Sequence, residues 1–458
     1  MGAESIPRLL VEFSLPVMTG MIVQALYNVI NRMFIGNAPE AATLGIAAIT
    51  LGMPISLLCM AFGGLVGFGG AAALSIYLGE QDTDRSERAL GNGFTLALLI
   101  GIGLTIAGIA LLDPLLSLLG ATAEVLPYAR QYNRLVLLGS VPRTVSFVLS
   151  NLIRAEGNPA RSMRIMITSA VCNVGFDALF IAALHLGVLG AALGTVLSQS
   201  IAATLSVRYY VSRSSHVRLR LRNLRLDRRI AARCLGLGSS AFFMHVGNSA
   251  LQLVLNSQLS RYGGDLALAA WGIVQSIGLF FLFPIFGING GSQPLIGYNY
   301  GARSYRRVRI AASWAILAAS CVALLAFGVV QLFPRGVAGL FSGRDRALLD
   351  LAVFGLRVAY LALPIVGFQI VAAGYFTSVG KPATSMFLTL SRQLLLLIPL
   401  AFLMPRLLGL DGLFIAVPMA DGLASLVTLA FFISEMRRLR RAEIAGAPPR
   451  PDADRTVL

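Results

Sequence analysis

Apolar segments separated by short polar stretches make up nearly the whole chain. A helix that spans a bilayer needs roughly 20 predominantly apolar residues, and twelve segments meet that requirement. We expect transmembrane helices at residues 11–35, 44–79, 89–112, 124–153, 160–185, 188–211, 233–260, 265–298, 309–333, 346–378, 383–405 and 410–435. The pattern therefore predicts an all-α polytopic membrane protein.

The second half of the sequence repeats the first at an interval near 222 residues. The stretch GNPARSM at 157–163 returns as GKPATSM at 380–386, and YLG at 77–79 has its counterpart in NYG at 299–301. Each copy contains six predicted helices, an even number, so both copies enter and leave the membrane on the same side. Parallel repeats of this kind are related by an axis along the membrane normal. We expect two six-helix bundles with the substrate path between them.

The polar stretches set the expected domain boundaries. An N-terminal lobe covers residues 1–211 with helices one to six, and a C-terminal lobe covers 233–435 with helices seven to twelve. Residues 212–232 form a basic linker. Residues 436–458 form a polar, Pro-rich tail, which we expect to be disordered because it contains too few apolar residues to form a core.

The composition agrees with a membrane protein, since 56% of the residues are hydrophobic, 13% are charged and the mean hydropathy is +0.76. The net charge of +16 raises the question of where the 37 basic residues lie. We place 26 of them on the side of both termini and seven on the opposite side. The positive-inside rule then puts both termini in the cytoplasm. We expect the basic linker to contact anionic lipid rather than nucleic acid.

Asp177 is one of two carboxylates that fall clearly inside predicted spans. A charge at the bilayer centre costs about 2.5–3.5 kcal/mol even on lenient insertion scales, so such a residue is a functional candidate. Asn173 lies four positions earlier, which places both side chains on one helix face. Two interpretations stay open. Asp177 is either a structural hydrogen-bond hub or arginine partner, or a proton or sodium site, because burial favours the neutral form of a carboxyl group.

Asp421, in the twelfth predicted helix, favours a structural interpretation. Arg392 in the preceding helix is a candidate ion-pair partner, and a carboxylate paired with arginine stays ionised. Neither Asp177 nor Asp421 has an acidic counterpart about 222 residues away. This asymmetry indicates ion coupling in one lobe only.

Uncharged polar side chains follow one face of the first helix and one face of the seventh, at spacings of three and four residues. Such faces suit a cavity that hydrates and weakly binds many ligands, although amides also join helices by hydrogen bonds. We assign to a substrate cavity Gln24, Tyr27, Asn28, His245, Asn248, Gln252 and Asn256.

Motifs of ATP-driven or catalytic proteins are missing from the sequence. It contains no GxxxxGK[ST] P-loop, no Gly-x-Ser-x-Gly elbow and no His-Glu-x-x-His pair. The Gly-rich stretch at 63–70 lies within an apolar segment and indicates close helix packing. We expect neither an enzyme nor a bound cofactor.

Several short sequence motifs, found in the same order along the chain, resemble those of the multidrug and toxic compound extrusion (MATE) transporters, most closely their MepA-like bacterial branch. They are FSLP at 13–16, GSQPLIGYNYG at 291–301, GKP at 380–382, RQ at 392–393 and PMAD at 418–421, and the resemblance covers roughly residues 6–435. It implies two six-helix bundles that form a V around a central cleft and rock between inward-open and outward-open states. It also implies that Asp421, Arg392 and Gln393 are structural or gating residues.

The cation site of the family corresponds here to Asn173, Asp177 and Thr195. Many relatives carry an aspartate at the end of the first helix, where this chain has Asn31. The resemblance therefore leaves Asp177 as the sole acid of the site. With the oxygens of the other three residues it would suit Na+, which wants several hard oxygen ligands, whereas a proton needs only the carboxylate.

Our sequence hypothesis is a monomeric secondary antiporter of the bacterial inner membrane. It would export organic cations or toxic metabolites in exchange for H+ or Na+. Two other interpretations stay open: a lipid-linked-saccharide flippase of the same superfamily and, from another class, a membrane receptor or channel. The sequence determines neither the physiological substrate nor the coupling ion.

Overall fold

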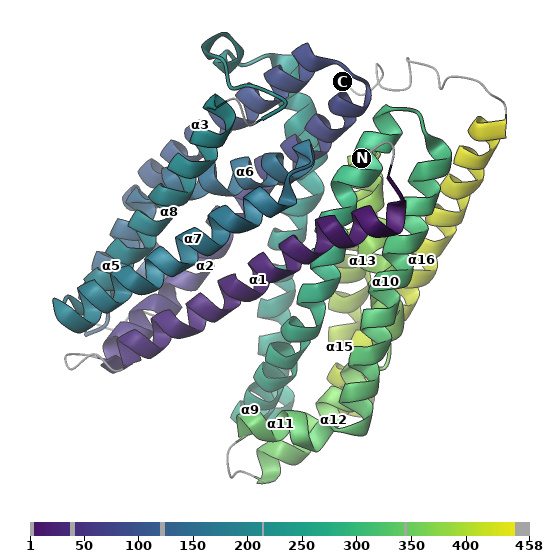
Figure 1. Cartoon of the computed structure of the whole chain (residues 1–458). Coiled ribbons are helices and arrows are strands. Elements are labelled where there is room, and N and C mark those ends of the chain that lie inside the picture. Colours follow the sequence, from purple (N-terminus) through teal and green to yellow (C-terminus); the bar gives the residue numbers. More distant parts are fainter. Residues whose placement is uncertain (1–3, 37–41, 120–123, 213–214, 343–345, 445–458) are drawn as a thin grey trace. The chain divides into compact units, whose positions relative to one another are not determined.

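The computed structural model describes residues 4–36, 42–119, 124–212, 215–342 and 346–444, and this part of the chain is helical without a β-strand (Figure 1). The α-helices are α1 (Ile6–Gly36), α2 (Ala42–Gly79), α3 (Thr83–Ala110), α4 (Leu112–Leu118), α5 (Leu126–Leu138), α6 (Ser140–Glu156), α7 (Pro159–Asp177), α8 (Gly187–Val211), α9 (Arg228–Gly301), α10 (Tyr305–Leu332), α11 (Pro334–Ser342), α12 (Arg346–Ala359), α13 (Leu363–Ser378), α14 (Pro382–Leu390), α15 (Ile398–Leu408) and α16 (Leu410–Ile444). Two π-helical segments, η1 (Ala178–Ala183) and η3 (Ser391–Leu397), and a 3-10 turn, η2 (Leu221–Leu224), complete the described elements.

Nine of the described helices are long and apolar enough to cross a membrane. One of them, α9, contains two predicted spans, which meet at Gly264, where a φ of 63° and a ψ of −156° interrupt the helix. Two bent pairs supply further spans: α5 and α6 meet at 49°, and α12 and α13 at 55°. The twelve predicted spans are therefore accommodated, and the all-α fold class is confirmed.

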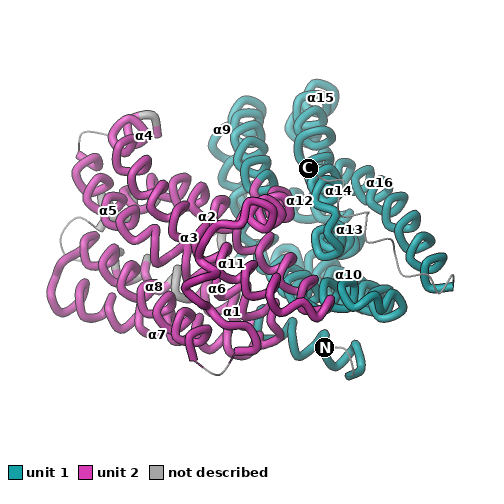
Figure 2. Tube along the Cα trace, turned by 90° about the horizontal axis from the view of Figure 1, so that it is seen from above, with its two compact units in different colours: residues 1–18, 243–458 teal, residues 19–242 magenta. Residues whose placement is uncertain are grey.

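Two compact units make up the chain, as Figure 2 shows in separate colours. Unit 1 contains Met1–Met18 and Phe243–Leu458, and unit 2 contains Thr19–Phe242. Each unit has its own apolar core. In unit 2 the core lies mainly between α2, α3, α6 and α8, and in unit 1 the largest cluster lies between α9, α12, α15 and α16.

The first part of α1 packs in unit 1. Leu9 and Phe13 are buried with Ile288 of α9 in one apolar cluster. A Cβ atom at Gly291 would lie 2.6 Å from the Cα atom of Ser14, so glycine is needed for the two backbones to approach this closely. The boundary between the units therefore falls inside the first helix, whereas the sequence assigned that whole helix to the N-terminal lobe.

The two repeated stretches form the same turn in both halves. Gly157 and Gly380 have φ angles of 108° and 81°, a region that glycine enters without steric cost. The backbone N–H of the residue after each glycine donates to the carbonyl five positions earlier in the chain. The distance is 3.1 Å for Asn158 and 2.7 Å for Lys381. These bonds satisfy the last carbonyl groups of a helix. The repeat is thus present in the backbone geometry as well as in the residues.

Equivalent serines reinforce both turns. The Oγ atom of Ser162 lies 2.7 Å from that of Ser150 in the preceding helix. In the second half, the Ser385 hydroxyl donates to the carbonyl of Ala373 at 2.9 Å. Both contacts join positions twelve residues apart. Each half therefore fixes its loop to the preceding helix at corresponding positions.

The basic linker is anchored on unit 2 by two buried acids. The Glu87 carboxylate, on a side chain only 7% exposed, accepts a hydrogen bond from Asn223 at 3.2 Å and pairs with Arg220 at 3.3 Å. Glu156 accepts from the backbone N–H of Val217 at 3.2 Å. The sequence predicted a basic segment at the membrane surface but gave no sign of these contacts, because their partners are more than 60 positions apart in sequence.

Two predicted boundaries need correction. Helix α9 already begins at Arg228, inside the segment predicted as linker. Helix α16 continues to Ile444, so the prediction of a disordered tail is wrong for residues 436–444. Residues 445–458 lie outside the described part of the chain.

Candidate functional site

Asp177 lies in unit 2 at the junction of α7 with the π-helical segment η1. Single π-helical turns inside α-helices are frequent at functional sites. The side chain of Asp177 is completely buried, and Asn173, one helical turn earlier, is 2% exposed. The two predicted site residues on α7 therefore share a buried face, as their spacing of four residues indicated.

Helix α8 meets this face at Gly194. A Cβ atom at Gly194 would lie 2.6 Å from Oδ1 of Asp177 and 3.7 Å from Nδ2 of Asn173. The carboxylate therefore lies directly against the backbone of α8, which a larger residue would prevent. Gly194 was not predicted from the sequence, although its position directly before Thr195 was a signal that could have led to it.

The other two predicted coupling residues belong to the same unit. Thr195 is half-buried on α8, and its carbonyl accepts a hydrogen bond from the Ser198 hydroxyl at 2.9 Å. Asn31 is half-buried on α1. All four residues of the predicted site thus lie in unit 2, with Asp177 and Asn173 as its most deeply buried members.

Gly194→Ala should disturb the site selectively. Its methyl group would overlap the Asp177 carboxylate, and overpacking of this kind costs about 1–3 kcal/mol. The carboxylate has to move to relieve the overlap, so we expect a loss of about tenfold or more in ion-driven transport, since about 1.4 kcal/mol is a factor of ten. The matched control is Gly175→Ala on α7, where a Cβ atom meets nothing within 4 Å and alanine favours the helix. Dye export from vesicles, measured beside the thermal unfolding midpoint, checks this. Equal losses in the two variants would contradict the close contact as the cause.

Several side-chain amides on the polar face of α9 are hydrogen-bonded to one another. Asn248, Gln252 and Asn256 are exposed, and His245 is half-buried. Nε2 of Gln275 donates to the side-chain Oε1 of Gln252 at 2.7 Å, and Nε2 of Gln252 donates to Oδ1 of Asn256 at 3.4 Å. These amides connect the two spans within α9. Gln275 was not predicted from the sequence, because it lies outside the helical spacing of the predicted polar face.

The corresponding face of α1 is described only in part. Gln24 is exposed. The side chains of Tyr27 and Asn28, which the sequence assigned to the substrate cavity, lie outside the described residues. Their part in a cavity stays a prediction.

The π-helical segment η3 presents two adjacent polar residues to different helices of unit 1. Arg392 pairs through Nε with Oδ1 of Asp421 on α16 at 2.5 Å, and their side chains are 30% and 5% exposed. Gln393 donates to Oδ1 of Asn248 on α9 at 2.8 Å. The ion pair suggested by the sequence is present, and the bond between Gln393 and Asn248 was not foreseen.

The chain combines three features: two units with equivalent turns, helices long and apolar enough to span a membrane, and a buried polar site in one unit. Together they define a multi-pass membrane transporter built from a repeat. The MatE family model matches residues 16–179 and 241–403, one match in each half of the sequence. The chain belongs to the MatE family of transporters, and it is not an enzyme.

Curated and solved relatives agree with this assignment over nearly the full length. The multidrug export protein MepA of Staphylococcus haemolyticus is 28% identical over 436 residues, which cover 95% of each chain. A multidrug resistance MATE family transporter of the MOP superfamily, solved in an outward-facing conformation, has a TM-score of 0.90 at 25% identity, with 95% of this chain and 97% of that chain covered. A MOP superfamily transporter from Pyrococcus furiosus has a TM-score of 0.89, with the same identity and coverage.

Proposed function

We propose that this transporter exports organic cations or other toxic small molecules in exchange for H+ or Na+ by alternating access. The names of its relatives support multidrug export. The observation that supports ion coupling is the complete burial of the Asp177 side chain in a helix long and apolar enough to span the membrane. An intramembrane carboxylate is costly, and proteins keep it mainly for ion pathways and proton relays.

In this proposal, Asp177 binds the coupling ion from outside the cell. Asn173, Asn31 and Thr195 assist, because their amide and hydroxyl oxygens are the hard ligands that Na+ prefers. Ion binding neutralises the carboxylate and changes its contact with the α8 backbone at Gly194. The rearranged unit then binds the drug less tightly, and the drug leaves outward.

Either the membrane potential or the gradient of the coupling ion provides the energy for export, depending on the net charge that one cycle moves. One elementary charge moving down 100 mV supplies about 2.3 kcal/mol, and about 1.4 kcal/mol corresponds to a factor of ten in concentration. A cycle that moves one net charge inward therefore sustains roughly 50-fold accumulation of substrate. One-for-one exchange of a monovalent organic cation for H+ or Na+ moves no net charge, and the gradient of the coupling ion drives it instead. Export at that level needs no ATP.

The polar residues of the two stripes would bind the substrate weakly. They are Gln24, Tyr27, Asn28, His245, Asn248, Gln252 and Asn256. We assign Asp421, Arg392 and Gln393 a structural or gating role instead, because their ion pair and hydrogen bond connect η3 to α16 and α9. The substrate is thus held by amides, a hydroxyl and an imidazole rather than by a carboxylate.

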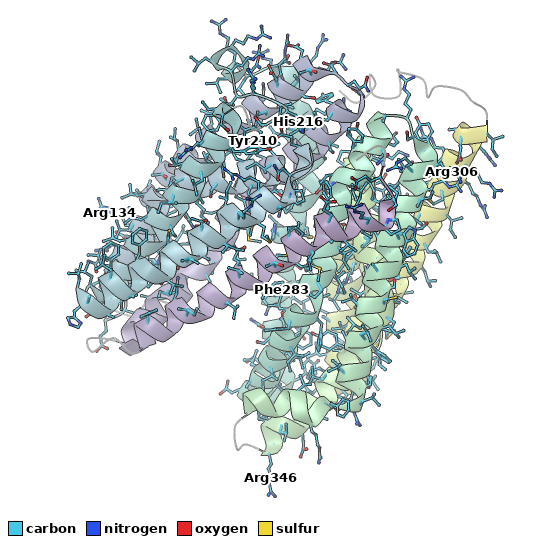
Figure 3. All side chains as sticks on the ribbon, in the orientation of Figure 1. Arg134, Tyr210, His216, Phe283, Arg306 and Arg346 are labelled. Carbon is cyan, nitrogen blue, oxygen red and sulfur yellow. The ribbon has the colours of Figure 1, made fainter. Side chains whose placement is uncertain are left out.

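The protein is proposed to be a monomer in the bacterial inner membrane with both termini in the cytoplasm. By the loop assignment from the sequence, Arg306 is one of the 26 basic residues on the side of both termini and Arg346 is one of the seven on the opposite side. Figure 3 shows these two residues at opposite ends of unit 1. Arg306 belongs to the more basic side. The positive-inside rule places that side in the cytoplasm.

Ethidium export from vesicles tests the proposed function. A pH gradient and a Na+ gradient are imposed separately, and we expect one of them to drive ethidium against its own concentration gradient. Ion current without movement of ethidium would show a channel. If neither gradient moves the dye and a lipid-linked saccharide is translocated instead, the chain is a flippase and the antiport proposal is wrong.

A further inference from the structure

Each unit carries an apolar surface groove, and the two grooves occupy equivalent positions of the repeat. The groove of unit 2 has a volume of 710 Å³ and runs along α3, α6 and α8, and that of unit 1 has a volume of 610 Å³ and runs along α10, α13 and α16. Lining residues correspond at a spacing of 222: Phe94 and Ile316, Val207 and Leu429, Val211 and Ile433. Because the groove recurs at corresponding positions in both units, it is a feature of the repeated fold and not an irregularity of one unit.

Apolar side chains form most of the unit 1 groove. Phe368 and Phe432 pack edge to face with ring centroids 5.9 Å apart. Ile433 is 40% exposed at the groove. The volume is within the range of about 300–1,000 Å³ typical of small-molecule sites. Because the three helices cross the bilayer, hydrocarbon chains are the solvent on this surface, and a lipid chain fits the lining.

One end of the unit 1 groove is strongly basic. It is lined by Arg309 near the start of α10 and by Arg437 and Arg440 near the end of α16. Arg309 pairs with Glu443 at 2.7 Å. In the described part of the chain, Arg437 and Arg440 are exposed and form no ion pair with a carboxylate. Their spacing of three residues places both guanidinium groups on one face of α16.

The equivalent groove of unit 2 differs in charge. Its lining contains a single basic residue, Arg208. The two grooves therefore share an apolar shape, and only the groove of unit 1 combines that shape with a cluster of arginines. An occupant that needs both features would prefer unit 1.

We propose that the unit 1 groove binds an anionic glycerophospholipid of the surrounding membrane. An acyl chain lies along the apolar lining, and the headgroup phosphate lies between Arg437 and Arg440. The planar guanidinium group donates two parallel hydrogen bonds to phosphate oxygens. Basic pockets between transmembrane helices are known to bind anionic headgroups. This site lies outside the coupling site and the polar stripes.

Native mass spectrometry of the full-length, delipidated protein tests the proposal. The protein is titrated with phosphatidylglycerol and with phosphatidylcholine of the same acyl chains. We expect tighter binding of phosphatidylglycerol. Arg437→Gln with Arg440→Gln should weaken that binding about 30-fold, which corresponds to about 1 kcal/mol for each arginine near an anionic lipid surface. Equal binding of the two lipids by the wild type would overturn the proposal.

A charge-matched double variant is the control. Arg306→Gln with Arg441→Gln removes the same charge from two exposed residues near the same helix ends that do not line the groove. We expect its lipid affinity to stay within about threefold of the wild type, less than half of the roughly 1.4 kcal/mol that corresponds to tenfold, because neither arginine contacts the proposed headgroup position in the groove. A loss equal to that of the groove variant would show general surface electrostatics and would overturn the proposal.

Ser320→Phe tests the apolar part independently of charge. Ser320 lines the groove, and a phenyl ring there would take the space of the acyl chain. We expect phosphatidylglycerol binding to fall at least tenfold while the thermal unfolding midpoint shows that the protein is folded. Unchanged lipid binding in this variant, or displacement of the lipid by ethidium from wild-type protein, would assign the groove to another occupant and contradict the proposal.

Discussion

Asp177→Asn should abolish ion-driven export. The substitution keeps the size of the buried side chain and removes its ability to bind H+ or to supply a charged ligand to Na+. Accumulation of ethidium against its own concentration gradient, which the imposed pH or Na+ gradient drives in the wild type, should fall to none. Movement of ethidium down its own gradient should persist, because the proposed role of Asp177 is coupling and not substrate binding.

The control for this prediction is Asp411→Asn. Asp411 is an exposed acid at the start of α16, so the same chemical change there should leave export at the wild-type level. Both variants are compared at equal amounts of folded protein in the vesicle membrane. Gradient-driven accumulation that survives in Asp177→Asn would remove Asp177 from the coupling mechanism and direct attention to other polar residues of unit 2.

Asp421→Leu should destabilise unit 1 by about 3–5 kcal/mol, the typical cost of leaving one partner of a buried ion pair alone. The Asp421 side chain is only 5% exposed, and Arg392 would remain beside it without a carboxylate. The double substitution Asp421→Leu with Arg392→Met should restore most of the stability, since an apolar pair of similar volume is often as stable as the ion pair. The free energy of unfolding in detergent is the measurement.

An exposed ion pair in the same unit serves as the control. Arg335 and Asp350 lie 3.2 Å apart with side chains 76% and 65% exposed. Asp350→Leu should change the stability by no more than about 1 kcal/mol. If Asp421→Leu left the stability unchanged but stopped export, the structural role of Asp421 would be wrong and a coupling role would replace it.

Much of the architecture was readable from the sequence because membrane insertion depends on local composition. A bilayer requires about 20 apolar residues for each span, so the twelve segments could be counted directly. The repeated turn at Gly157 and Gly380 was visible for a similar reason: a positive φ angle restricts the residue type at one position. Asn173 and Asp177 could be paired because helical spacing is local.

Other features depended on contacts between distant segments. The close approach of Gly194 to Asp177, the bond between Gln393 and Asn248, and the anchoring of the linker by Glu87 each join different helices. The π-helical segments that position Asp177 and Arg392 were equally hidden, since a single inserted residue in a helix has no fixed residue signature.

The sequence alone determined the number of spans, the repeat and the side chains able to carry charge within the membrane, because each depends on the nature of one segment. The tertiary structure decided that the first part of α1 packs with the second half of the chain. It also decided that Gln393 is hydrogen-bonded to Asn248 and that equivalent grooves of the two units differ in charge. These outcomes depend on which faces of the helices pack together. That packing involves many residues distant in sequence, and hydropathy along the chain does not encode it.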